Sequence, residues 1–185
     1  MKRVFLPVLC AFALVLSTEA TAQKFSGLDK SPADIASFPA SYKISNKAAR
    51  VIYSRPQLKG RSISDLAPEG KVWRTGANEA AEITLFANAT IGGENIQAGT
   101  YSLFTIPGDG EWTIILNGNL NQWGAYSYDS NADIARFKAK TSTASESLEA
   151  FSIAFKEANE AGETHLVLGW GTTRVALPMT FSLVN

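Results

Sequence analysis

The stretch Gly99-Thr-Tyr-Ser-Leu-Phe-Thr-Ile-Pro-Gly-Asp-Gly-Glu-Trp-Thr-Ile-Ile-Leu116 decides the fold class. Its two halves, 99–106 and 112–116, are rich in β-branched and aromatic residues, which favour strands. Pro107-Gly-Asp-Gly110 between them has the composition of a turn, so the stretch predicts a β-hairpin. Ile91-Gly-Gly-Glu94 predicts a second hairpin, because its glycines supply the positive φ angles that a tight turn needs.

Apolar and polar residues alternate with period two along most of the remaining chain. Alternating segments occur near residues 51–53, 83–87, 135–139, 151–155, 166–170 and 175–183. Roughly eight to ten short strands separated by turns predict an all-β fold, an antiparallel β-sandwich or jelly-roll-like single domain.

Three segments need a separate interpretation. Ser and Thr dominate Thr141–Ser147, which we expect to be a solvated connection. Glu and Ala in Leu148–Ala161 would suit a helix, but the strict alternation within 151–155 favours a strand running into a turn near Gly162. Pro178 predicts an edge position or a bulge, because proline cannot donate to a strand ladder.

The first residues have the features of an export signal. Lys2 and Arg3 precede an apolar run, and Ala20-Thr-Ala22 matches the small-x-small pattern of a cleavage site. The apolar run is shorter than the roughly 20 residues that span a bilayer as a helix. We therefore expect a signal peptide at 1–22, an extended N-terminal arm at 23–40 and a β-sandwich domain at 41–185. The mature protein would start at Gln23 and be periplasmic or secreted.

Composition argues against several classes of function. The 17 Lys and Arg residues balance 17 Asp and Glu residues, whereas nucleic acids and anionic membranes select basic proteins. We expect neither nucleic acid as a partner nor stable membrane insertion. The single Cys lies in the expected signal peptide, and His165 is the only histidine. A zinc site needs more nitrogen or sulfur ligands. Asp129-Ser-Asn-Ala-Asp133 resembles the start of a calcium loop, but it lacks the glycine that should follow and is more typical of a turn. No metal and no cofactor is therefore expected.

One segment departs from the strand pattern. Lys71-Val-Trp-Arg-Thr-Gly-Ala-Asn-Glu-Ala80 places an indole, a guanidinium, an amide and a carboxylate around Gly76. Burying such polar groups without partners costs about 2–7 kcal/mol each or more. The segment therefore either faces a ligand or belongs to a paired polar network.

Several motifs together resemble a bacterial secreted family, the domain of unknown function 2911. They are Lys71–Ala80, Tyr53-Ser-Arg-Pro56, Lys59-Gly-Arg61, Gly99–Pro107 and Gln122-Trp-Gly-Ala-Tyr126. The resemblance extends from about Ser31 to the C-terminus and implies a bacterial host. It implies no particular activity.

The polar residues of these motifs allow two interpretations. The guanidinium groups of Arg55, Arg61 and Arg74 suit carboxylates, phosphates and sulfates, and they stack on aromatic rings. They either hold loops together by pairing with acidic residues (Glu79, Asp65 or Glu82) or bind an anionic or polyhydroxyl ligand. The loop around Trp123 lacks strand alternation, so it either binds a ligand or plugs the end of the sandwich.

The predicted ligand-binding residues combine arginine, amide, carboxylate and aromatic side chains: Arg55, Arg61, Arg74, Asn78, Glu79, Tyr101, Trp123 and Tyr126. We expect Arg74, Asn78 and Glu79 to converge with Arg55 and the 123–126 loop on one polar pocket.

This pattern favours a non-enzymatic binding or accessory module of the cell envelope for a carbohydrate or a small anionic ligand. One alternative is a hydrolase of envelope or dietary glycans, with Glu79 as acid or base and Glu82 or Asp65 as partner. A structural or partner-docking protein is the other. No residue is assigned a catalytic role.

Overall fold

The computed structural model describes residues 23–159 and 162–182, so the expected signal peptide lies outside the described residues. The described chain is almost entirely antiparallel β-structure, which confirms the predicted fold class. Its helical segments are α1 (Ile63–Leu66) and the 3-10 turn η1 (Ser130–Ala132).

The nine strands in the described residues form one open sheet with the order β1-β2-β3-β6-β7-β8-β9-β4-β5. They are β1 (Ala33–Phe38), β2 (Ala49–Ser54), β3 (Ala81–Leu85), β4 (Ala89–Ile91), β5 (Glu94–Ile96), β6 (Gly99–Ile106), β7 (Glu111–Asn117), β8 (Asp133–Phe155) and β9 (Glu163–Phe181). The two hairpins predicted from glycine-containing turns are confirmed as β4–β5 and β6–β7.

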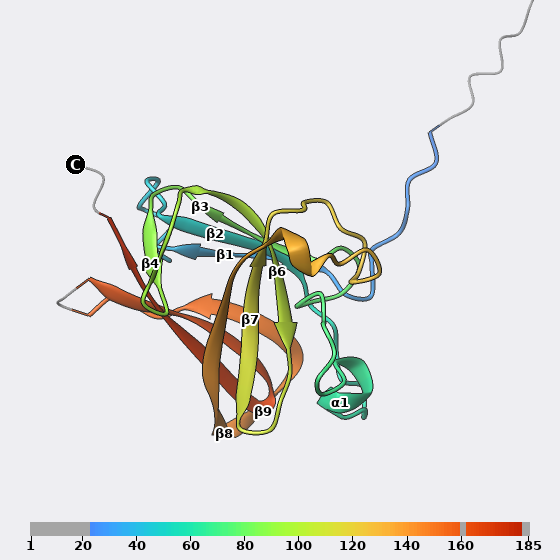
Figure 1. Cartoon of the computed structure of the whole chain (residues 1–185). Coiled ribbons are helices and arrows are strands. Elements are labelled where there is room, and N and C mark those ends of the chain that lie inside the picture. The colour runs from blue at the N-terminus through green and yellow to red at the C-terminus, as the bar shows by residue number, and fades with distance from the viewer. Residues whose placement is uncertain (1–22, 160–161, 183–185) are drawn as a thin grey trace, which may run out of the picture.

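The long strand β8 turns this sheet into two layers (Figure 1). Residues up to Lys140 pair with β7, and residues from Thr141 onward pair with β9, with irregularities on both sides of Leu148. The prediction of a connection at Thr141–Ser147 was therefore wrong, because the backbone remains extended there. Most of that segment is exposed; a Ser- and Thr-rich composition indicates exposure and does not by itself exclude a strand.

The N-terminal arm expected at 23–40 contains a strand of the sheet. β1 pairs with β2 from Ala33 opposite Ser54 to Phe38 opposite Ala49. Pro32 and Pro39, two of the residues that indicated an extended arm, flank this strand without interrupting it. The body of the domain thus begins before residue 41.

Pro178 lies at a break in the pairing of β9. Val175 is the last β9 residue paired with β8, and Met179 is the first paired with β4. The Pro178 carbonyl accepts a bond from Gly92 N at 3.2 Å. Proline has no N–H to donate to a strand ladder. At Pro178 the pairing of β9 with β8 has already ended, so no hydrogen bond of that ladder is lost.

The core lies between the two layers and has an aromatic centre. The ring of Trp73 stacks on Trp170 with centroids 5.3 Å apart. It meets Phe151 edge-on at 5.0 Å and Trp112 at 6.3 Å. Packing of this kind is favourable beyond the area it buries. Trp73 therefore anchors the start of the unusual 71–80 segment in the core.

Candidate functional site

Two connections cover the outer face of β6 and β7. We call residues 71–80 the motif loop and residues 118–132, between β7 and β8, the aromatic loop. Beneath them, Phe104 and Ile115 are buried together with Ala80. The central strands are thus buried on both faces, and the two loops rest on a packed base.

The two loops pair through their backbones at Glu79 and Trp123. Two N–H···O bonds, of 2.8 and 3.1 Å, flank this pair: Ala80 to Gln122 and Gly124 to Asn78. Glu79 and Trp123 are therefore a non-hydrogen-bonded antiparallel pair, the arrangement in which opposite side chains lie closest. The carboxylate of Glu79 and the indole of Trp123 project from the same face.

Trp123 and Tyr126 project into solvent. Trp123 is 63% exposed and Tyr126 83% exposed, whereas the other three tryptophans of the chain are at most 6% exposed. An indole that plugged the end of the sandwich would be buried. The exposure therefore favours a contact surface over a plug.

Arg74 reaches the same place from the motif loop. Its Nη1 lies 3.5 Å from the position that a Cβ would take on Gly124, and the Tyr126 ring lies 2.8 Å from that position. Arg74 Nε donates to Gly76 O at 3.3 Å, and Arg74 forms no ion pair within the described residues. The pairing with Glu79, one of the two interpretations of Arg74, is absent there, which leaves both charged groups available.

The two loops also concentrate backbone strain. Three of the four non-glycine residues with left-handed φ in the described chain lie here: Thr75 at 53°, Asn78 at 60° and Asn121 at 57°. A β-branched residue in this region is an outlier, and Thr75 is fully buried, with its hydroxyl donating to Thr105 Oγ1 at 3.2 Å. Such strain costs about 1–3 kcal/mol per residue and clusters at functional sites.

The chain leading into β1 also contacts the motif loop. Asn78 Nδ2 donates to Asp29 Oδ1 at 3.1 Å. Bonds from Ser31 N and from Asn78 lower the pKa of the Asp29 carboxyl below its usual value. Sequence reasoning missed Asp29, because 49 positions separate it from Asn78 and no local motif marks it.

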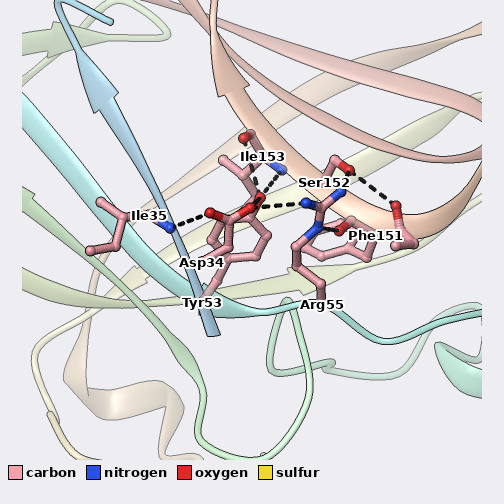
Figure 2. Close-up of polar contacts among 8 residues, drawn as sticks. Asp34, Ile35, Tyr53, Arg55, Phe151, Ser152 and Ile153 are labelled. Atoms are coloured by element: carbon pink, nitrogen blue, oxygen red, sulfur yellow. Dashed lines mark hydrogen bonds and ion pairs between the residues drawn. The ribbon is translucent and has the colours of Figure 1, made fainter. Parts of the chain in front are cut away.

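The structure brings together five of the eight predicted residues, which we call the paired-loop site: Arg74, Asn78, Glu79, Trp123 and Tyr126. The Arg55 side chain has partners in β1 and β8, as Figure 2 shows. Its Nε donates to Phe151 O at 3.0 Å, Nη1 to Asp34 at 3.0 Å and Nη2 to Ser152 Oγ at 2.7 Å. All three nitrogens of the Arg55 guanidinium are therefore engaged, and the group is a strut between β1 and β8.

Tyr53 completes the network in Figure 2. Its hydroxyl accepts from Ile153 N at 2.9 Å and lies 3.3 Å from the Asp34 carboxylate. Burial raises the pKa of the Tyr53 phenol. We call Asp34, Tyr53, Arg55 and Ser152 the clasp, because their side chains connect β1 and β2 to the second half of β8.

The other predicted residues also have structural partners. Arg61 donates to backbone carbonyls three and four residues before it, both at 2.9 Å. Tyr101 donates to the carbonyl four residues before it at 2.9 Å. Asp65 belongs to the capping box of α1, where its bonds with Ser62 lower its pKa. Glu82 accepts from the backbone of the aromatic loop at 2.8 Å.

A polar network holds the C-terminal end of the aromatic loop. Tyr128 donates to Asp133 Oδ2 at 2.6 Å, and Arg136 donates to both of them at 2.7 and 2.8 Å. Asn117 donates to Asp133 Oδ1 at 2.8 Å, and the Tyr128 ring meets Phe104 edge-on at 5.0 Å. Burial, together with Asp133, raises the pKa of Tyr128 to about 12. The network fixes where the aromatic loop joins β8.

Comparison with protein families bears on this geometry. The family model described as protein of unknown function (DUF2911) matches residues 32–179. The chain belongs to this family. The match includes both loops of the paired-loop site, and Asp29 lies just before it. Comparisons with curated proteins and with solved structures found no match.

In the paired-loop site of this DUF2911 protein, the Trp123 and Tyr126 side chains are exposed. Two hollows of about 530 Å³ beside α1 and about 430 Å³ beside β1 are lined by other residues. Within residues 23–159 and 162–182, no group of three or more His, Cys, Asp or Glu side chains could hold a metal ion. No helix in this part of the chain is long and apolar enough to span a bilayer.

Proposed function

We propose that this DUF2911 protein is a non-enzymatic binding module that holds a carbohydrate on the paired-loop site. The main support is the exposed indole of Trp123, held beside the Glu79 carboxylate by backbone bonds on both sides. An aromatic face can stack on the C–H face of a sugar ring, while carboxylate and guanidinium groups bond to its hydroxyls.

The paired-loop site offers the mixture of donors and acceptors that a polyhydroxyl ligand needs. Arg74 is donor-only, an ionised Glu79 is acceptor-only, and the Asn78 side-chain amide is both. Because neither charged group is engaged in an ion pair within the described residues, binding would not have to break one. The packed base formed by β6 and β7 limits the entropy lost when a ligand binds.

A glycan array combined with tryptophan fluorescence tests this proposal. Trp123 is the only exposed tryptophan of the four, so a bound sugar should change its emission and protect it from a soluble quencher. We expect Trp123→Ala to abolish binding to the array. Tyr42→Ala removes a comparably exposed ring, 89% exposed, outside the two loops and should leave binding unchanged. Binding that survives Trp123→Ala, or no glycan binding at all, would contradict the proposal.

We also propose that the protein acts in the periplasm or outside the cell. The charged start, the apolar run and Ala20-Thr-Ala22 support export. A glycan-binding surface would be useful at the cell envelope, where glycans are exposed.

A further inference from the structure

We propose that Asp29 is a further ligand-contact residue and that it makes the site select uncharged or amine-bearing sugars over uronic acids. The inference rests on the proposed carbohydrate-binding function and narrows its ligand class. It follows from the position of Asp29, from its unused oxygen and from the charges gathered around the paired loops.

Asp29 is held at the site by the motif loop and by the chain that follows it. Its Oδ1 accepts from Asn78 Nδ2 at 3.1 Å and from Ser31 N at 2.7 Å. Three residues later, Pro32 O accepts from Arg55 N at 3.0 Å, which ties this chain to the end of β2. Asp29 is therefore placed beside Asn78 by contacts that the body of the domain supplies.

The second oxygen of Asp29 is free to meet a ligand. Both bonds to the carboxylate end on Oδ1, and Asp29 is exposed. Oδ2 thus has no partner among the described residues. A lowered pKa keeps this carboxylate ionised at neutral pH. An ionised carboxylate accepts bonds from sugar hydroxyls or from an ammonium group.

The charges around the site disfavour an anionic ligand. Asp29 and Glu79 contribute two carboxylates, and Arg74 contributes one guanidinium. Lys30 is next to Asp29 and helps to lower the pKa of its carboxyl. The Lys30 ammonium forms no hydrogen bond or ion pair within the described residues, so it is not held at the site as the doubly bonded Asp29 carboxylate is. A ligand that carries the same charge as the site binds with lower affinity, because the like charges repel each other. A uronic acid would face this excess negative charge, whereas a neutral or amine-bearing sugar would not.

A charge-matched glycan panel tests the inference, with each neutral oligosaccharide accompanied by its 6-carboxylate and 2-amino analogues. For the mature protein, we expect the carboxylate analogue of each bound sugar to bind at least about tenfold more weakly. Asp29→Asn keeps the size of the side chain and removes its charge, and it should reduce this ratio to about twofold to threefold. Glu94→Gln, an exposed carboxylate in β5, is the control and should leave the ratio unchanged.

The possible outcomes separate this inference from the proposed function. Carboxylate analogues that bind as tightly as the neutral sugars, or a ratio that Asp29→Asn leaves unchanged, would overturn the inference. In either case, glycan binding that depends on Trp123 would still support the proposed function. If no member of the panel binds, both fail together.

Discussion

At the residue scale, Arg55 and Arg74 show how the same side chain can serve two purposes. Each is partly exposed; Arg55 follows strand β2, and Arg74 follows the buried Trp73. Arg55 uses all three guanidinium nitrogens on partners in β1 and β8. Arg74 forms one hydrogen bond, of 3.3 Å, to a carbonyl two residues away. Because Arg55 and Arg74 have different partners, the same substitution should affect stability differently at the two positions.

We expect Arg55→Met to lower the free energy of unfolding by about 1–3 kcal/mol, because it removes hydrogen bonds of a charged donor and leaves the Phe151 carbonyl without its Arg55 donor. Arg74→Met should cost under about 1 kcal/mol while weakening ligand binding strongly. Urea unfolding of both variants measures the difference. A loss for Arg74→Met as large as that for Arg55→Met would show that Arg74 is a structural strut and would remove it from the site.

Tyr128 should titrate unusually late. Its pKa of about 12 exceeds the ordinary value of 10.0, so the folded protein favours the neutral phenol. The stabilisation from this network should be fully present below about pH 10 and be lost as the pH rises towards 12. Ultraviolet absorbance of tyrosinate, compared between the wild type and Tyr128→Phe, isolates this ionisation. Identical titration curves near pH 12 would contradict the prediction.

At the element scale, the site depends on two loops that pair only because β6 and β7 hold them together. Gly124 lies where the two loops pair: its N–H donates to Asn78 O at 3.1 Å, and its φ is left-handed at 69°. A Cβ on Gly124 would lie 2.8 Å from the Tyr126 ring. This glycine therefore sets how near the aromatic ring and Arg74 can come to the loop backbone.

We expect Gly124→Ala to impair ligand binding more than Gly93→Ala does, although both should lose about 1 kcal/mol of stability or more from backbone strain. Gly93 has a φ of 92°, and no heavy atom lies within 4 Å of the position that its Cβ would take. It is therefore the matched control for strain without a clash. Thermal unfolding and Trp123 fluorescence measure both effects. Equal ligand binding by the two variants would contradict the prediction, because it would mean that displacing the Tyr126 ring does not affect binding.

At the scale of the whole molecule, one continuous strand and one polar network unite the two layers. β8 belongs to both layers, and the clasp connects its second half to β1 and β2. The chain that leads into β1 passes the paired-loop site before it enters the sheet. Processing of the N-terminus would thus occur only a few residues from the proposed ligand contact.

The mature protein should begin at Gln23 and be recovered from the periplasm or the medium. The reason is the apolar run followed by Ala20-Thr-Ala22. N-terminal sequencing and mass spectrometry of the exported protein check this expectation. An intact Met1 or a lipid attached to Cys10 would contradict it.

The sequence by itself determined the fold class and the two hairpins. Period-two alternation and glycine-containing turns are local signals, so they can be read without knowing the partners of a strand. The extent of β8 through Thr141–Ser147 was not predictable in this way, because β8 continues there from its pairing with β7 into its pairing with β9, which begins at Thr141. β1 was missed for the same reason, since its six residues form a strand by pairing with β2.

The sequence also singled out the motif and aromatic loops as the segments that break the strand pattern. Only the tertiary structure decided which of their residues meet. Strand order and register place Glu79 beside Trp123 and bring Asp29 to Asn78 across 49 positions. The same register directs Arg55 to β8, 96 positions away. Contacts at such separations depend on how the whole sheet folds over, which no local pattern of residues specifies.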